Sequence, residues 1–245
     1  MNRLKSLNLS LGLAVLVAGC GSDAPESTPA PAAAPVEEFL DPVVVDGEHY
    51  RLELENDWLR VLRENLAGGD VGAMHSHRPR VSVYLKDAEV ELTPRGGEPS
   101  TGKIVAGSAA WGEATTHVGR PLSEVENLSI ELQDLSGDAI VPSDVDATVV
   151  DPEHHVVEFE NDRVRVVRMT YPAGTTSPLH DHPPGFAVFL NAGALTNTPE
   201  GGEPAVLEFE AGETQWGSGG PPHTTDNTGD SDVVVLRVEM KKKPS

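Results

Sequence analysis

The chain has 245 residues, which allows one or two domains with cores of their own. Its hydrophobic fraction of 38% is too high for a disordered chain, and its 24 glycines and 20 prolines favour a turn-rich, β-rich class. Eighteen lysines and arginines against 39 acidic residues give a formal net charge of −21, which repels phosphate backbones and argues against nucleic acid as a partner.

Residues 1–19 have the pattern of a signal peptide. Arg3 and Lys5 give a short basic start, and the apolar stretch Leu7–Ala18 is shorter than the roughly 20 residues that a membrane span needs. The stretch runs into Leu16–Cys20, where small residues lead into a cysteine and the sequence resembles the lipobox of bacterial lipoproteins. The resemblance implies that Cys20 becomes the mature amino terminus and carries lipid.

The residues around Cys20 predict where the protein is held. Gly21 and Ser22, in place of an aspartate, resemble the pattern that directs lipoproteins to the outer membrane. We therefore expect a lipid-anchored protein of the cell envelope that faces the periplasm, with the membrane as a partner through Cys20. Residues 20–42 are rich in Ala, Pro, Ser and Glu and predict a semi-extended tether. Cys20 is the only cysteine, so an intrachain disulfide is impossible.

The remainder of the chain is a tandem repeat. The segment Glu48–Asp57 matches Glu153–Asp162 at a spacing of 105 residues, and the same spacing continues through most of the sequence that follows. This predicts two domains, at residues 43–137 and 149–245, joined by a linker at 138–148. We expect the chain to be separable near Gly137–Asp146, where the composition turns small and acidic and few buried contacts should cross. Packing of the two barrels on each other through apolar sheet faces stays open.

Each copy reads as strands and turns. Apolar residues alternate with residues of the opposite face, as at Val81, Val83 and Leu85, and no stretch of ten residues has a helical period. Glycine- or proline-containing breaks follow at short intervals, which predicts six to eight short strands in each copy. Without a helix to cover a sheet face, such strands form a closed barrel or a jelly roll, so the fold class is all-β with two tandem barrels.

Three histidines recur at matching places in the two copies. Two of them stand two residues apart on a strand, so both imidazoles leave the same face and converge on one point. A third histidine some 40 residues later completes a set of three nitrogens, which suits divalent transition metals and leaves positions open for water or substrate. The predicted metal ligands are His75, His77 and His117 in the first copy and His180, His182 and His223 in the second. A purely structural role, with the imidazoles held by hydrogen bonds in the core, stays open.

At these histidines the chain resembles the cupin superfamily. The family's motifs are a glycine followed by His-x-His, and a second glycine followed by a distant histidine and an asparagine. The second copy shows all of them: Gly174, His180, His182, Gly212, His223 and Asn227. The resemblance implies double-stranded β-helix barrels and a metal cofactor among Fe, Mn, Zn, Cu and Ni.

Two departures from the cupin pattern limit what the resemblance implies. The first copy has Pro121 where the asparagine would stand, so we expect the second site to hold metal more tightly and to carry most of any activity. The usual glutamate shortly after the second histidine is missing from both copies, so the sequence places no carboxylate at the metal. Asn227 either orients His223 through a hydrogen bond or serves a turn.

Three classes of function remain open at this point. The first is a metal-dependent enzyme, most simply an Fe(II) oxygenase that acts on a small molecule, as the resemblance to three-histidine cupin dioxygenases implies. The second is a non-catalytic envelope protein that binds a small molecule or metal, and the third is hydrolase or isomerase chemistry. Arg78 and Arg80 favour an anion if the first site takes a charged ligand, whereas Trp111 and Trp216 are better explained as seals of the barrels. The sequence leaves the oligomeric state undetermined.

Overall fold

The structure is a computed structural model, and it describes residues 38–245. The predicted signal peptide, Cys20 and most of the predicted tether lie outside the described residues. Among the described residues, no helix has both the length and the apolar character that crossing a membrane requires.

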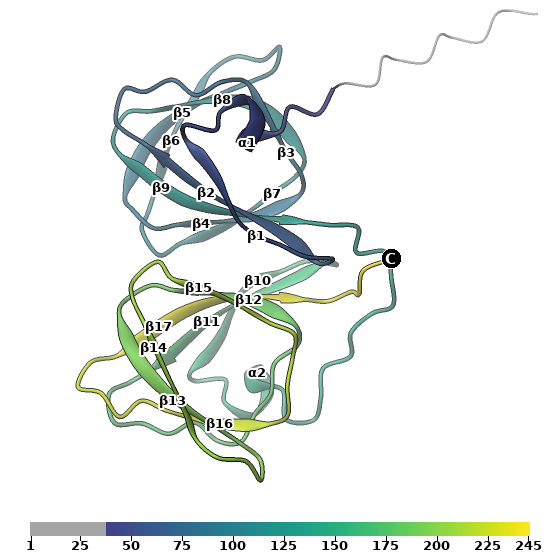
Figure 1. Ribbon diagram of the computed structural model, residues 1–245, viewed down its shortest axis with the longest axis vertical. Helices are drawn as coiled ribbons and strands as arrows, with labels where there is room; N and C mark the ends of the chain where they lie inside the picture. Colours follow the sequence, from purple (N-terminus) through teal and green to yellow (C-terminus); the bar gives the residue numbers. More distant parts are fainter. Residues whose placement is uncertain (1–37) are drawn as a thin grey trace, which may run out of the picture. The chain divides into compact units, whose positions relative to one another are not determined.

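The first copy folds into a barrel of strands with one short helix (Figure 1). Its elements are α1 (Pro42–Val45), β1 (Tyr50–Glu55), β2 (Leu59–Leu66), β3 (His75–His77), β4 (Arg80–Tyr84), β5 (Ala88–Pro94), β6 (Ser100–Ile104), β7 (Ala109–Gly112), β8 (Thr115–Pro121) and β9 (Val125–Leu132). They form a five-stranded sheet in the order β1-β2-β9-β4-β7 and a four-stranded sheet in the order β3-β8-β5-β6. All strand pairs in both sheets are antiparallel.

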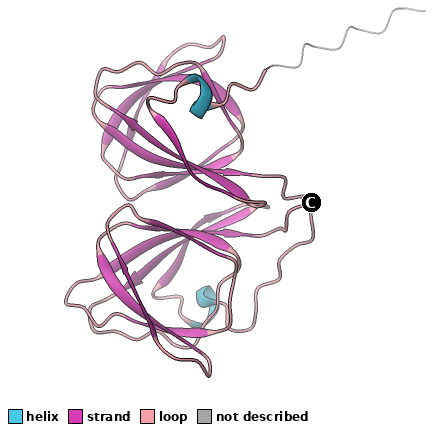
Figure 2. Ribbon diagram, viewed as in Figure 1, coloured by secondary structure: helices cyan, strands magenta, loops and turns pink. Residues whose placement is uncertain are grey.

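The second copy repeats this arrangement almost element for element, and strands dominate both copies in Figure 2. Its elements are α2 (Ala147–Val150), β10 (His155–Glu160), β11 (Val164–Tyr171), β12 (Gly185–Phe189), β13 (Gly193–Pro199), β14 (Ala205–Phe209), β15 (Thr214–Gly217), β16 (His223–Asp226) and β17 (Val233–Met240). The sheets have the orders β10-β11-β17-β12-β15 and β14-β13-β16. The predicted all-β class with two tandem jelly-roll barrels is confirmed.

Each copy begins with a four-residue helix capped by an aspartate at the same place in the repeat. Asp41 Oδ1 accepts a hydrogen bond from the backbone N–H of Val43, and Asp146 Oδ1 accepts one from Thr148. The same two carboxylates also bind arginines of the second strand of each copy: Arg60 Nη1 lies 2.8 Å from Asp41, and Arg165 Nη2 lies 2.7 Å from Asp146. These pairs tie the start of each copy to its five-stranded sheet.

The outward faces of the two five-stranded sheets form one core that both copies share. Val83 and Ile130 of the first copy are fully buried in the same apolar cluster as Val166 and Leu236 of the second. Burying side chains of this size typically stabilises a protein by about 1.5–3 kcal/mol each. Of the two arrangements left open by the sequence, the copies thus adopt the one in which they pack on each other through apolar sheet faces, and residues 38–245 form one compact unit with a common core.

Two reciprocal hydrogen bonds connect the copies beside this core. Arg63 Nη2 donates to the carbonyl oxygen of Gly212 at 2.6 Å, and Arg168 Nη2 donates to that of Gly107, also at 2.6 Å. The two arginines occupy equivalent positions of the repeat, and so do the two glycines. Both glycines have a positive φ, 73° at Gly107 and 80° at Gly212, which other residues adopt only with strain. The arginine of each copy thus donates to the glycine of the other copy, as is expected when two copies are related by a two-fold axis.

Candidate metal centres

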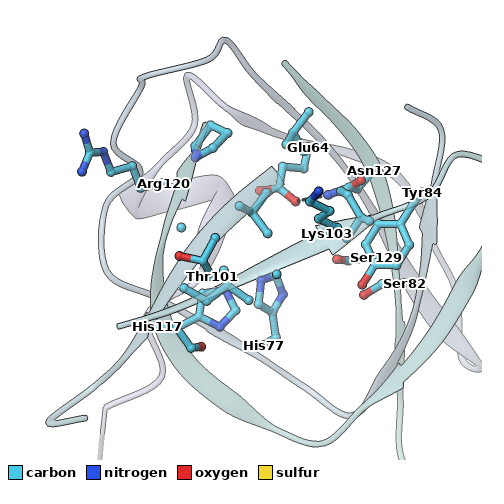
Figure 3. A pocket seen from close by; sticks show the side chains of 18 of the residues that line it. Glu64, His77, Ser82, Tyr84, Thr101, Lys103, His117, Arg120, Asn127 and Ser129 are labelled. Atoms are coloured by element: carbon cyan, nitrogen blue, oxygen red, sulfur yellow. Dashed lines mark hydrogen bonds between the residues drawn. The ribbon is translucent and has the colours of Figure 1, made fainter. Parts of the chain in front are cut away.

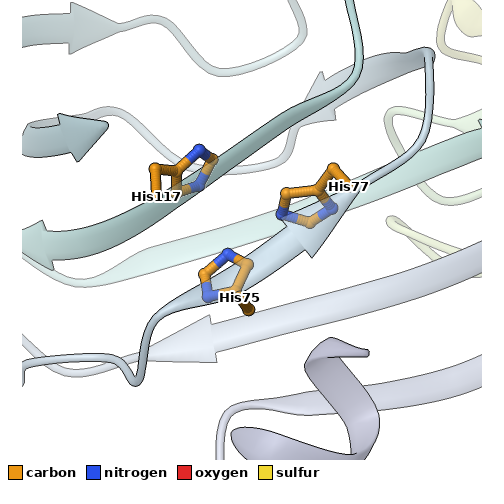
Figure 4. Close-up of side chains that lie close together, drawn as sticks. All are labelled: His75, His77 and His117. Atoms are coloured by element: carbon orange, nitrogen blue, oxygen red, sulfur yellow. The ribbon is translucent and has the colours of Figure 1, made fainter. Parts of the chain in front are cut away.

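Three histidines come together inside the first barrel (Figure 4). His75 and His77 lie on the same face of β3, and β8 pairs with β3 so that His117 stands directly opposite His75. The ring centroids are 4.8 Å apart for His75 and His77, 4.8 Å for His75 and His117, and 5.3 Å for His77 and His117. One ligand atom from each histidine lies within 4.8 Å of the others, a spacing at which the three could hold a metal ion. The structure thus brings together all three residues that the sequence singled out in this copy.

The outer nitrogens of two of these imidazoles are fixed by oxygen atoms. His75 Nδ1 donates to the carbonyl oxygen of Ala73 at 2.8 Å, and His77 Nδ1 lies 2.7 Å from Glu131 Oε1 on β9. Such oxygens accept hydrogen bonds, so Nδ1 carries the proton and Nε2 keeps a lone pair directed away from them. This is the arrangement that orients histidines as metal ligands.

The second barrel repeats the same support. His180 pairs with His223 in an isolated β-bridge that corresponds to the pairing of His75 with His117. His180 Nδ1 donates to the carbonyl oxygen of Pro178 at 2.8 Å, and His182 Nδ1 lies 3.0 Å from Glu239 Oε1 on β17. The carboxylate on the last strand of each copy therefore holds the second histidine of each His-x-His pair.

A fourth histidine belongs to the second cluster. The histidines whose ligand atoms lie within 4.8 Å of one another are His155, His180 and His182. The ring of His223, the predicted third ligand, lies 4.6 Å from that of His180 and 5.8 Å from that of His182, but in the set with this spacing of ligand atoms His155 stands in its place. Four imidazoles thus gather in the second barrel.

His155 was left unassigned by the sequence reasoning. It opens β10, and its equivalent in the first copy is Tyr50, whose hydroxyl group lies 3.2 Å from His75 Nε2. The alignment of the two copies could have pointed to His155, because it places this histidine at the position of a tyrosine at the start of a strand. Because the matching residue was not a histidine, the pattern of three did not include it.

Burial keeps the imidazoles neutral at neutral pH. It lowers the pKa of His117 to about 3, assisted by the charges of His75 and Arg80. It also lowers the pKa of His182 well below its ordinary value, assisted mainly by Arg237. A neutral imidazole is the form that binds a metal ion, so little proton competition opposes binding.

The donor set fits a divalent transition metal. His180 Nε2 is fully buried and has no hydrogen-bond partner among the described residues, a costly state for a polar atom. A metal ion at this nitrogen would satisfy it. Neutral imidazole ligands suit Zn, Cu, Fe and Ni.

The cavities beside the two clusters differ in character. In the first barrel a cavity of about 230 Å³ is lined by His77 and His117 on one side and by mostly polar side chains on the other (Figure 3). In the second barrel a cavity of about 200 Å³ reaches His182 and His223 and is lined by apolar and polar side chains together. The polar wall of the first cavity includes Glu64, Ser82, Tyr84, Lys103, Asn127 and Ser129. The second has an apolar part, made by Met169, Ala187, Phe189, Leu195, Leu207 and Val235, and a polar part that includes Tyr171, Asn197, Gln215 and Thr225.

Comparison with known proteins locates this architecture among solved structures. Neither a protein-family model nor a curated protein matches the chain. AerE from Microcystis aeruginosa is 14% identical with a TM-score of 0.51, over 79% of this chain and 93% of that one. A variant of oxalate decarboxylase from Bacillus subtilis is 13% identical with a TM-score of 0.50, over 82% of this chain and 77% of that one. A cupin 2 conserved barrel domain protein from Leptotrichia buccalis is 11% identical with a TM-score of 0.47, over 78% and 88%.

The chain has the cupin fold, in two copies. At these identities the likeness concerns the fold, so the chemistry has to be argued from the cupin barrels of this chain itself. Their clearest departure from the usual motif is the source of the carboxylate. Val81 and Ser82 stand where the first cupin motif usually has its glutamate, whereas Glu131 and Glu239 reach the histidines from the last strand of each barrel.

Burial changes the acidity of both carboxyl groups. It raises the pKa of Glu131 to about 7, against the opposing charges of Arg60, Arg78 and Arg80. It also raises the pKa of Glu239, against the charges of Arg165 and Arg237. The sequence could not place these groups, because the contact joins β9 to β3 and β17 to His182 across the barrel.

Asn227 serves a turn in the second cupin barrel. Its amide nitrogen donates to the carbonyl oxygens of Tyr171 at 2.8 Å and Ser231 at 2.9 Å, and its Oδ1 accepts from the N–H of Gly229 at 3.0 Å. These backbone contacts occupy the side chain, so the alternative in which Asn227 orients His223 is replaced by the turn role. His223 Nδ1 faces the carbonyl oxygen of Pro221 instead, at 3.4 Å.

The two tryptophans have structural surroundings. Trp111 and Trp216 both pack against the core shared by the barrels. The ring of Trp216 also lies 5.8 Å from that of Trp58 of the other copy, and the Arg163 guanidinium lies over the ring of Trp111. They therefore seal the junction between the barrels.

Proposed function

We propose that the protein is a metal-dependent enzyme for a small molecule, with one divalent transition metal ion held by histidines in each cupin barrel. The observation that carries the proposal is the convergence of buried, neutral imidazoles whose Nδ1 atoms are held by carbonyl and carboxylate oxygens. The Mn(II) centres described for the oxalate decarboxylase of Bacillus subtilis support a metal role for such a fold.

Fe(II)-dependent oxygenation is the reaction class that we put first. Three neutral protein ligands leave coordination positions open, and iron, when bound, would supply the redox chemistry that reaction with dioxygen requires. His75, His77 and His117 would hold the ion in the first barrel, and His180, His182, His223 and His155 would hold it in the second.

The first barrel offers protein groups that can handle protons near the imidazoles. The Tyr50 hydroxyl lies 3.2 Å from His75 Nε2, and burial followed by the charge of Glu64 raises the pKa of Tyr50 well above its ordinary value. Glu64 lines the same cavity, where its carboxylate accepts a hydrogen bond of 3.1 Å from Asn127. The equivalents in the second barrel are His155 and Met169, which supply no carboxyl group. We therefore assign turnover to the first barrel, where Tyr50 stays protonated and Glu64 can accept a proton.

Metal analysis followed by oxygen consumption tests this proposal. The protein purified from its own host, and the protein reconstituted with Fe(II), should consume oxygen with at least one member of a panel of small phenols, thiols and keto acids. His77→Ala should abolish this activity, because it removes an imidazole from the first cluster. Oxygen consumption that is equal in the unmodified protein and in His77→Ala would contradict the assignment.

Binding without turnover is the second candidate. The observation that favours it is the fourth imidazole of the second barrel, which would fill a coordination position that a substrate needs. In that case metal and ligand would bind while no panel compound is consumed. Turnover distinguishes the two candidates.

We also propose that the protein is anchored to the outer membrane through a lipid on Cys20. The support is the sequence Leu16–Cys20 and the residues that follow it. Replacing Cys20 with Ser should abolish metabolic labelling by a fatty acid and release the protein from the membrane fraction or leave an uncleaved precursor. Unchanged labelling in Cys20→Ser would contradict the anchor.

A further inference from the structure

Each cupin barrel contains an arginine beside its histidines, half-buried in the first barrel and buried in the second, but the two arginines come from different strands. Arg80 stands on β4 and lines the first cavity together with His77 and His117. Arg237 stands on β17 and lines the second cavity together with His182 and His223. The two arginines are therefore not at equivalent positions of the repeat, although both cavities contain a guanidinium group.

The strand pairing shows that the two copies have exchanged the position of the arginine. β4 pairs with β9 as β12 pairs with β17, and in these ladders Arg80 corresponds to Gly185, while Ser129 corresponds to Arg237. Each copy thus has one arginine and one small residue at this pair of positions, in opposite order.

The guanidinium groups nevertheless occupy the same place in the two barrels. A Cβ atom built on Gly112 of β7 would lie 3.3 Å from Arg80 Cζ, and one built on its equivalent Gly217 of β15 would lie 3.4 Å from Arg237 Nη2. A Cβ on Gly185 would also lie 3.4 Å from Arg237 Cζ, so Arg237 fills the space that the missing side chain leaves. Both barrels thus have a guanidinium group at the same location, supplied by β4 in the first and by β17 in the second.

Internal partners leave much of the donor capacity of these arginines unused. The Nε atoms of Arg80 and Arg237 are buried and have no hydrogen-bond partner among the described residues. Arg237 is only 9% exposed, and its Nη2 donates to the carbonyl oxygen of Pro183 at 2.9 Å. Its Nε lies 3.6 Å from a Glu239 carboxylate that already binds Arg165 at 2.6 Å. Arg80 Nη1 makes a long contact of 3.4 Å with the carbonyl oxygen of Glu113. A buried guanidinium with free donors is costly unless an anion completes it.

We propose that Arg80 and Arg237 each bind the carboxylate of a small organic acid beside the histidines. The proposal names the ligand class of the function proposed above and rests on it for the role of the metal, but carboxylate binding itself needs only the arginines. A carboxylate matches the planar fork of a guanidinium and balances a single positive charge. In the second cavity Arg237 is the one lysine or arginine among the residues that line it, which favours a singly charged carboxylate over a phosphate.

The cavity walls further separate the two ligands. Glu64, Tyr84 and Asn127 meet across three strands of the first barrel, and Figure 3 shows them gathered on the wall opposite the histidines. The equivalent residues of the second barrel are Met169, Phe189 and Val235. The first site should therefore prefer an acid with further hydroxyl groups, and the second an acid with an apolar chain.

Titration calorimetry of the whole protein tests this with malate and hexanoate as probes, each added to chelator-treated and to Zn(II)-loaded protein. Malate should bind the first site and hexanoate the second. Arg80→Gln should weaken malate binding at least about tenfold and leave hexanoate binding unchanged, since a charge-assisted pair is worth this much or more. Arg237→Gln should do the reverse.

The chain itself provides a rescue and a control. Combining Arg80→Gly with Ser129→Arg gives the first barrel the arrangement of the second, and should restore malate binding to within a few fold of the unmodified protein even if the Arg80 variants are less stable. Arg51 lies outside both cavities, where its exposed side chain pairs with Glu53, so Arg51→Gln should change neither affinity.

Several outcomes would overturn the inference. They are the absence of binding of either acid to both forms of the protein, equal binding in the arginine variants, failure of the rescued variant, and binding of inorganic phosphate in preference to both acids. Loss of metal binding with carboxylate binding retained would instead contradict the function proposed above and leave this inference standing.

Discussion

At the scale of single residues, the sequence predicts the histidines well and their supports poorly. His75, His77 and His117 could be identified because spacing along a strand and repetition in a second copy both follow from the order of residues. Glu131 could not, because it reaches His77 across 54 positions of sequence through the closure of the barrel. A usable signal was present, since an acidic residue stands between two apolar residues near the end of the last strand in both copies.

The carboxylates on the last strands should raise the affinity of the clusters for metal. Glu131→Gln and Glu239→Gln keep the size of the side chain but remove the charge that holds His77 or His182, so each should weaken metal binding in its own barrel by about 10- to 100-fold. Competition with a chromophoric chelator measures this. Glu91→Gln, at a partly exposed residue beside Arg120, is the matched control and should leave affinity unchanged. Equal affinities in all of these proteins would show that the carboxylates do not support the ligands.

His155 should distinguish the two clusters. His155→Tyr gives the second barrel the residue that the first has at this position, so the second cluster should lose one coordinating imidazole and bind metal on the order of tenfold more weakly. Electron paramagnetic resonance of the Cu(II)-loaded protein counts the coordinating nitrogens. A spectrum identical to that of the unmodified protein would mean that His155 only packs against the cluster.

At the scale of elements, each copy has an aspartate–arginine ion pair at its start, and the two pairs differ in how deeply the aspartate is buried. Asp146 is fully buried where it binds Arg165, whereas the Asp41 side chain is 32% exposed where it binds Arg60. Asp146→Asn keeps a helix cap but loses the charge, so it should lower the free energy of unfolding at pH 7 by about 1.5–3 kcal/mol. Asp41→Asn should cost less, about 1 kcal/mol or below. Urea unfolding measures both, and a larger loss at Asp41 would contradict the role given to burial.

The pH dependence of this difference follows from the pKa of Asp146. Burial raises that pKa, but the hydrogen bonds from Arg165 and Thr148 outweigh burial and leave it below the ordinary value of 3.8. The stabilisation is therefore complete above pH 3.8 and is lost as the pH falls through the lowered value in the folded protein. The Asp146→Asn variant and the unmodified protein should accordingly converge in stability in acid. A difference that stays constant down to the acid transition would contradict this.

At the scale of the whole molecule, strands and turns were predictable from alternation, but the face that each strand buries was not. In the first copy Val81 and Val83 point into the core shared with the second copy, while Ser82 and Tyr84 point into their own barrel. The alternation of apolar and polar residues shows that the two faces of a strand differ, but it does not show which face lines the interior of the barrel and which packs against the other copy. Whether the two copies can be separated therefore stays a question for experiment.

Cutting the chain near residue 140 should expose this shared core. Residues 38–140 and 141–245 expressed alone should self-associate or precipitate, because each half then exposes an apolar sheet face. Expressed together, the halves should form a soluble one-to-one complex in size-exclusion chromatography. Two halves that are each monomeric and melt cooperatively would show that the shared core is not needed for folding.

The central claim is that each cupin barrel holds one metal ion on its own histidines. Elemental analysis after reconstitution with Fe(II), Mn(II) or Zn(II) and removal of unbound metal tests it most directly, with His77→Ala, His182→Ala and the double variant measured beside the unmodified protein. The account predicts two ions per chain in the unmodified protein, a loss confined to one barrel in each single variant, and almost none in the double variant. An unmodified protein that retains no metal, or a double variant that still binds two ions, would contradict it.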